Sequence, residues 1–164
     1  MAVMMYARIP SPTMQDRFDH ALAMSRTGNY VEAAKLYEKL FRLSPEHKLA
    51  DTASYKLGYL AYDEGRLREA IPLLQAHLKR YPSSRHADEA RWFIGWSQFR
   101  LGELEQSKGS FTTLLSKHPR SGLATAGRYW QARIDGLQGQ DEAARAGYED
   151  VLRRWPRSGY AWWS

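Results

Sequence analysis

The sequence predicts an all-helical, right-handed superhelical solenoid of four helix pairs, followed by the start of a fifth. Four glycines recur at a spacing of 37 residues, namely Gly28, Gly65, Gly102 and Gly139. Four prolines keep the same spacing, namely Pro45, Pro82, Pro119 and Pro156. Small residues follow the period as well, at Ala33, Ala70, Ser107 and Ala144. A fixed period between 20 and 50 residues is typical of a solenoid or a similar array.

The period divides the chain into one solenoid domain. Residues 1–13 form an N-terminal flank, and Thr13 is placed to cap a helix that starts at Met14. The repeats are expected at residues 14–50, 51–87, 88–124 and 125–161, and residues 162–164 form the stub of a fifth. Two tryptophans end the chain where a natural solenoid terminus carries a polar capping helix, so we expect an excerpt from a longer protein.

Each repeat is expected to hold two helices. The first ends at the marker glycine, which suits the left-handed conformation that terminates many helices. The second follows almost at once, and in the first repeat it spans Tyr30 to Leu43, with apolar residues at three- and four-residue steps. It stops before the marker proline. A serine two residues after three of these prolines is placed to cap the next helix. These serines are Ser84, Ser121 and Ser158.

The composition excludes several classes of protein. Cysteine is absent, so the chain has no disulfide, no thiol nucleophile and no thiolate metal site. The net charge of +6 arises from arginines scattered among acids without a basic stripe, which argues against a nucleic-acid partner. The apolar runs fall far short of the roughly 18 residues that span a bilayer, so no membrane span is expected.

The sequence shows no constellation of residues that could carry out catalysis. Its carboxylates cluster as sequence neighbours, such as Glu103 with Glu105, which splay around a helix instead of converging on a substrate. The histidines form no i, i+4 pair and have no partner at metal-ligand spacing. The glycines are explained by helix ends and close packing. We therefore expect no catalytic residue, no cofactor and no metal.

The repeat pattern resembles that of the tetratricopeptide repeat family. Gly58 and Gly95 stand where the family pattern has its first small residue, and the marker glycines precede its turn between helices. The resemblance covers about residues 14–158 and implies antiparallel helix pairs. It departs at the position that the family usually fills with tryptophan. Here the chain has Arg17, Ser54, Arg91 and Arg128.

The last repeat also resembles the superhelical region of bacterial soluble lytic transglycosylases. The likeness rests on Arg128-Tyr-Trp-Gln-Ala-Arg133 and on Pro156-Arg-Ser-Gly-Tyr-Ala161. The joints that begin at Pro82 and Pro119 are similar to those of periplasmic repeat proteins, including outer-membrane assembly lipoproteins. These resemblances imply a bacterial protein of the periplasm or cell envelope, although a cytoplasmic location stays open.

Aromatic residues are concentrated on the expected first helices. Tyr55, Tyr59 and Tyr62 lie at i, i+4 and i+7, and the next repeat places aromatics at equivalent positions. In tetratricopeptide proteins this column faces a concave groove, which the resemblance therefore implies here. The alternative, that the column is core between adjacent first helices, stays open. The predicted partner-binding groove comprises Phe18, Tyr55, Tyr59, Tyr62, Trp92, Phe93, Trp96, Phe99, Tyr129, Trp130 and Arg133.

Two functions fit this pattern. The first is a non-catalytic scaffold for protein–protein interaction or assembly, whose groove binds a peptide or helix of a partner protein. The alternative is a supporting module of a peptidoglycan-cleaving lytic transglycosylase, in which the same aromatics contact cell-wall glycan. Because Trp162 and Trp163 add to an apolar face of the fourth repeat, we also expect a homodimer through the C-terminal end.

Overall fold

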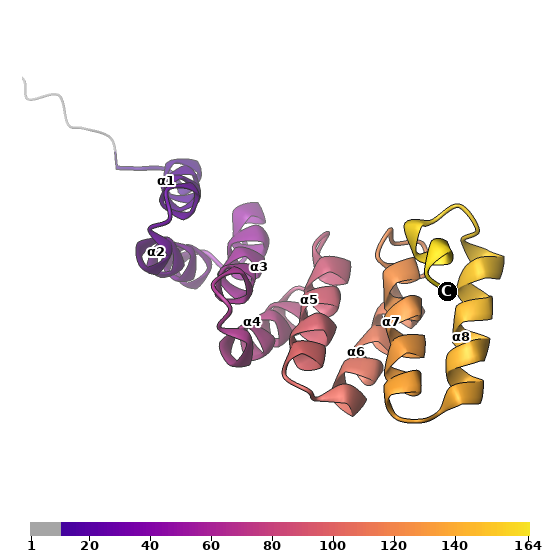
Figure 1. Cartoon of the computed structure of the whole chain (residues 1–164). Coiled ribbons are helices and arrows are strands. Elements are labelled where there is room, and N and C mark those ends of the chain that lie inside the picture. Colours follow the sequence, from indigo (N-terminus) through magenta and orange to yellow (C-terminus); the bar gives the residue numbers. More distant parts are fainter. Residues whose placement is uncertain (1–10) are drawn as a thin grey trace, which may run out of the picture. The chain divides into compact units, whose positions relative to one another are not determined.

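The computed structural model describes residues 11–164, so residues 1–10 of the expected flank lie outside the described part. Within the described part the chain forms α-helices, one short 3₁₀-helix and no strand (Figure 1). The elements are α1 (Met14–Arg26), α2 (Tyr30–Leu43), α3 (Lys48–Asp63), α4 (Leu67–Arg80), α5 (Ala87–Arg100), α6 (Leu104–Lys117), α7 (Ala124–Leu137), α8 (Asp141–Arg154) and η1 (Gly159–Trp162). The predicted all-helical class is confirmed.

The chain divides into two compact units, Met1–Ala53 and Ser54–Ser164, and the boundary falls inside α3. In the first unit, α1 packs against α2. Thr13 caps α1 as predicted. Its hydroxyl accepts a hydrogen bond from the Asp16 amide at 3.1 Å, and the Asp16 carboxylate accepts one from the Thr13 amide at 2.8 Å. The Phe18 and Tyr37 rings lie 5.8 Å apart between the two helices, and burial raises the pKa of Tyr37 to about 12.

In the second unit, helices pack mainly on their neighbours in the chain. The helix α5 contacts α4 and α6, and α7 contacts α6 and α8. Two groups of buried side chains form the interior, one around Leu74 and Ile94 and the other around Phe111 and Ile134. Contacts between consecutive elements are what a solenoid of helix pairs requires.

The two helices of a pair approach closely at a glycine of the first helix. A Cβ atom on Gly58 would lie 2.8 Å from the Leu74 side chain, and one on Gly95 would lie 2.8 Å from the Phe111 ring. Leu74 and Phe111 are fully buried at these contacts. Because a Cβ does not fit at these distances, the close packing of α3 on α4 and of α5 on α6 depends on these glycines.

The four marker glycines adopt the predicted left-handed conformation, with φ between 72° and 79°. Each lies in the short turn between the two helices of a pair, and no other described residue has positive φ. Positive φ costs an L-residue roughly 1–2 kcal/mol, which explains why glycine recurs here.

The prediction that serines cap the first helices is wrong for two of the three. The cap residues of α5 and α7 are His86 and Leu123, and neither helix has a side-chain cap. An extra turn separates each of these serines from its helix. The Ser84 hydroxyl instead accepts a hydrogen bond from the His86 amide at 3.0 Å, and the Ser121 hydroxyl accepts one from the Leu123 amide at 3.1 Å. Ser158 does cap, since its hydroxyl accepts the Ala161 amide at the start of η1. The helices α3, α5 and α7 also begin one to three residues before the expected repeat boundaries.

The marker conformation can be tested with two alanine substitutions. Gly102→Ala is expected to lower the free energy of unfolding by about 1–2 kcal/mol, because alanine must adopt positive φ there. Gly109→Ala, inside α6, is the matched control and is expected to raise it by about 0.5–1 kcal/mol. A Cβ atom meets open space at both positions, so steric clashes do not contribute. The difference in unfolding free energy, measured by urea unfolding, therefore reports the backbone conformation at each glycine. Equal effects would contradict the role of the marker glycines.

Candidate functional site

Aromatic side chains of α3 contact the next first helix, α5. The Phe93 ring lies 5.1 Å from the Tyr59 ring and 4.6 Å from the Tyr62 ring. All three side chains are half-buried. The Lys56 ammonium lies 5.3 Å from the centre of the Tyr59 ring, within reach of a cation–π interaction. This group therefore combines flat apolar surface with a cation at its rim.

A second aromatic group joins α5 to α7. The Trp130 ring lies 4.5 Å from Trp96 and 4.8 Å from Phe99, and both pairs are steeply tilted. Trp92, Trp96 and Phe99 run along α5 with nearly parallel rings, at interplanar angles of 7° and 12°. These side chains are half-buried as well. Phe99 and Trp130 pack against the buried group around Phe111, and this contact with the interior restricts the orientation of both rings.

The predicted groove residues differ in exposure: some side chains are buried and others are half-buried. Tyr55 is only 4% exposed, its ring stacks on His86 at 4.4 Å, and burial raises the pKa of its phenol. In the first unit, Phe18 is 9% exposed and packs on Tyr37. Trp92 contacts Phe111 at 5.3 Å. Tyr55 and Phe18 thus contribute to the interior, as the core alternative expects.

Six of the other predicted residues form a surface that we call the aromatic surface. It consists of Tyr59, Tyr62, Phe93, Trp96, Phe99 and Trp130. Tyr129 lies beside it and contacts Trp130 at 5.7 Å and Tyr160 at 5.1 Å. Arg133 and Arg100 are exposed on the same two helices, α7 and α5. Half-buried tyrosine and tryptophan at such a surface suit both an apolar and a wet environment.

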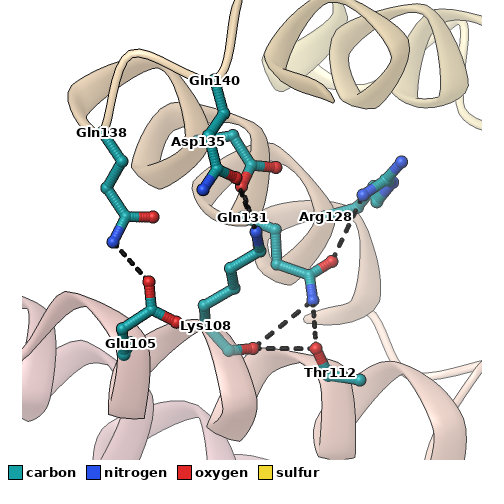
Figure 2. Close-up of polar contacts among 8 residues, drawn as sticks. All are labelled: Glu105, Lys108, Thr112, Arg128, Gln131, Asp135, Gln138 and Gln140. Atoms are coloured by element: carbon teal, nitrogen blue, oxygen red, sulfur yellow. Dashed lines mark hydrogen bonds and ion pairs between the residues drawn. The ribbon is translucent and has the colours of Figure 1, made fainter. Parts of the chain in front are cut away.

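A polar seam between α6 and α7 was not found from the sequence (Figure 2). Lys108 pairs with the buried carboxylate of Asp135 and donates to Gln140 at 3.3 Å. The Gln131 amide donates to the Thr112 hydroxyl at 2.6 Å, and the Gln138 amide donates to Glu105 at 2.6 Å. The position one period before Lys108 holds Ile71, so the seam follows no repeat and gave no periodic signal. Each of these side chains pairs with another across the seam, which indicates a structural role, and Gln138 Oε1 is the atom among them that is buried without any partner.

The described residues contain no cluster of three or more histidine or acidic side chains that could hold a metal ion. The half-buried His86 lies 3.2 Å from Glu89, and burial lowers the pKa of His118. No helix among residues 11–164 is both long and apolar enough to cross a membrane.

Family models match most of the chain. A tetratricopeptide repeat model matches residues 18–85 and 55–107, and a second tetratricopeptide repeat model matches residues 126–158. The chain belongs to the tetratricopeptide repeat family. Its helix pairs are therefore those of a tetratricopeptide-type solenoid, as the sequence predicted. No curated protein sequence matches the chain.

Solved structures share the fold at low sequence identity. A tetratricopeptide repeat protein from Parabacteroides merdae is 18% identical, with a TM-score of 0.76 over 90% of this chain and 56% of that one. MamA from Desulfovibrio magneticus RS-1 is 17% identical, with a TM-score of 0.67 over 86% of this chain and 75% of that one. At these identities the likeness concerns the fold alone.

The division between interior and surface aromatics predicts different costs of truncation. Tyr55→Ala is expected to lower the free energy of unfolding by about 3–5 kcal/mol, because it removes a buried ring and its packing. Tyr62→Ala on the same helix removes a half-buried ring and is expected to cost about half as much or less. Chemical denaturation followed by circular dichroism measures both. A larger loss for Tyr62→Ala would show that the assignment of the two rings is reversed.

Proposed function

We propose that this protein is a non-catalytic scaffold that binds an extended peptide or helix of a partner protein on the aromatic surface. Tetratricopeptide repeat proteins bind protein partners, and the family assignment supports the same general role here. The observation that carries the finer proposal is the aromatic surface itself. Three consecutive first helices contribute large rings that touch across the helices and remain half-buried.

The physical properties of this surface suit a binding site. Binding energy at protein interfaces concentrates in a few residues, among which tryptophan and tyrosine are enriched. The rings of Trp96 and Trp130 already hold each other at 4.5 Å, so a ligand that covers them has little side-chain freedom left to remove. Lys56 supplies a cation beside Tyr59, and Arg100 and Arg133 are exposed on the helices that carry Trp96 and Trp130. Positive charge on these helices speeds encounter with an acidic segment.

Truncation of Trp96 tests the proposal. A peptide ligand is first selected from a random displayed library on the wild-type protein. Trp96→Ala is then expected to weaken its binding by about thirtyfold, since a hot-spot aromatic contributes about 2 kcal/mol. The fold should tolerate the change, because the Trp96 ring is half-buried. Isothermal calorimetry gives the affinity, and thermal unfolding gives the stability.

Leu137→Ala is the matched control, since Leu137 is an exposed apolar residue at the end of α7 outside the aromatic surface. It is expected to change neither quantity. If Trp96→Ala removes about 3 kcal/mol or more of stability and leaves peptide affinity unchanged, the ring belongs to the core and the proposed function fails.

A second candidate uses the same surface for sugar. The nearly parallel rings of Trp96 and Phe99, with Trp92 next to them on α5, present flat faces of the kind that stack on pyranose rings. In that case the protein is the supporting module of a peptidoglycan-cleaving lytic transglycosylase and contacts cell-wall glycan. Soluble peptidoglycan fragments, titrated in place of the peptide, distinguish the candidates. The envelope location expected from the sequence belongs to both candidates and is tested by fractionating the source cells.

Self-association through the C-terminal end is a further part of the proposal. Trp162 is 85% exposed and Trp163 is 72% exposed, close to the exposed Leu152 in sequence. Large exposed apolar residues in one segment tend to find partners. Sedimentation velocity at micromolar concentration is expected to show a dimer that the double substitution Trp162→Ser and Trp163→Ser removes.

Val31→Ser is the control, because Val31 is 67% exposed and lies on α2. A monomeric wild-type protein, or a dimer that survives the double substitution, would contradict the predicted contact.

A further inference from the structure

Arg91 on α5 has no carboxylate partner. Its guanidinium donates one hydrogen bond, from Nη1 to the Ala87 carbonyl of its own helix at 3.1 Å. Its Nε is buried and meets no acceptor. Burial lowers the pKa of this guanidinium. Burial and, after it, the nearby charge of Arg91 lower the pKa of His118. A partly buried cation without a matching anion has lost some of its hydration and gained no ion pair in return.

In the next repeat the arginine at the equivalent position is paired with a carboxylate. Arg128 lies 37 residues after Arg91, and its Nε donates to the Asp150 carboxylate at 3.1 Å. Asp150 also accepts a hydrogen bond from Arg153 at 2.6 Å. The residue that corresponds to Asp150 one period earlier is Thr113. The third repeat therefore keeps the arginine and replaces its carboxylate with a hydroxyl.

A hollow of about 150 Å³ lies at this position in the third repeat. Three consecutive helices line it, with Gln75 and Leu78 from α4, Arg91 and Ile94 from α5, and Ser110 and Thr113 from α6. The Ser110 hydroxyl already donates to Gln98 at 2.6 Å, and the Thr113 hydroxyl donates to the Gly109 carbonyl at 3.0 Å. The guanidinium of Arg91 and the amide of Gln75 are therefore the groups in this lining that can donate to a carboxylate. The apolar walls of Leu78 and Ile94 strengthen electrostatic attraction inside the hollow.

We propose that this hollow is a carboxylate-binding site that receives an aspartate or glutamate side chain from an acidic segment of a protein partner. A guanidinium fork matches a planar carboxylate in shape and charge. The volume is below the roughly 300–1,000 Å³ of sites that hold whole small molecules, whereas one carboxylate with its methylene groups fits. The incoming carboxylate takes the place that Asp150 holds beside Arg128.

The surrounding charge favours an acidic polypeptide over a free anion. Arg85, Lys117 and Arg120 line a neighbouring hollow together with His118 and with one carboxylate, Asp88, which accepts a hydrogen bond from Ser121 at 2.6 Å. Cations therefore outnumber the acid in this lining. Basic side chains near a site raise the local concentration of acidic ligands. An acidic segment could contact these cations in succession while one of its carboxylates reaches Arg91. Arg91 lies on a different face of α5 from Trp96, so this contact is additional to the aromatic surface.

The first experiment supplies the carboxylate from within the chain. Thr113→Asp restores the residue type found at Asp150, and Thr113→Asn is its uncharged control of the same shape. The aspartate variant is expected to melt roughly 2–4 °C higher than the asparagine variant. This difference should vanish when Arg91→Gln is added to both. If the two variants melt together, or if the difference survives Arg91→Gln, the hollow does not accept a carboxylate at Arg91 and the proposal is overturned.

The second experiment supplies the carboxylate from outside. Hexaglutamate and sodium acetate are titrated separately, at matched ionic strength, while the side-chain Nε–Hε resonances of Arg91 and Arg128 are followed by NMR. Hexaglutamate is expected to shift the Arg91 resonance in a saturable manner and to leave Arg128 unmoved. Thr113→Asp should abolish the shift, whereas Gln106→Glu, which adds the same charge elsewhere on α6, should preserve it.

The remaining outcomes overturn the proposal in distinct ways. A saturable shift with acetate alone would mark a site for small anions instead of an acidic polypeptide. A shift that Thr113→Asp and Gln106→Glu reduce equally would indicate diffuse attraction to a basic protein. No shift at Arg91 with either probe would show that the guanidinium is closed to external carboxylates.

Discussion

The close contact between the two helices of a pair is the constraint on which the second unit depends. In two pairs a large side chain of the second helix presses against a glycine of the first, as Phe111 does against Gly95. The fourth pair keeps this contact with the roles exchanged. Its first helix carries Ala132, and Gly147 of the second helix provides the space, since a Cβ there would lie 2.6 Å from the Ala132 Cβ. The close approach is therefore preserved although the glycine changes helix.

This contact also determines where the aromatic residues lie. With α6 packed against the glycine face of α5, aromatic side chains on other faces of α5 meet rings of the neighbouring first helices. Phe93 then contacts Tyr62 of α3, and Trp96 contacts Trp130 of α7. The aromatic surface is thus a consequence of helix-pair packing repeated along the chain. No single loop or cleft creates it.

The sequence predicted features that depend on local conformation or on the period. The left-handed glycines, the span of α2 and the Thr13 cap all belong to this class, because each follows from a few neighbouring residues. It did not predict that Tyr55 is buried while Tyr62 is half-exposed. Both lie on one helix face, and their exposure depends on how far His86 and Phe93 of the next repeat reach over them.

The two polar features of the third and fourth repeats were missed for a different reason. The Lys108–Asp135 pair joins residues far apart in sequence and has no counterpart in the preceding repeat. The sequence showed arginines at the position where the family has tryptophan. It did not show which side chains these arginines contact. Only the structure shows that Arg128 meets Asp150 while Arg91 borders a hollow beside Thr113. Departures from a repeat pattern therefore locate sites that the pattern itself does not describe.

The six tryptophans allow a direct measurement of whether the aromatic surface contacts a partner protein. Indole N–H resonances of ¹⁵N-labelled protein can be followed while a library-selected peptide is added. If the aromatic surface binds the peptide, the Trp96 and Trp130 resonances shift together and saturate, while that of Trp155 stays unchanged. Saturable binding that leaves Trp96 and Trp130 unmoved would show that the peptide binds elsewhere on the protein.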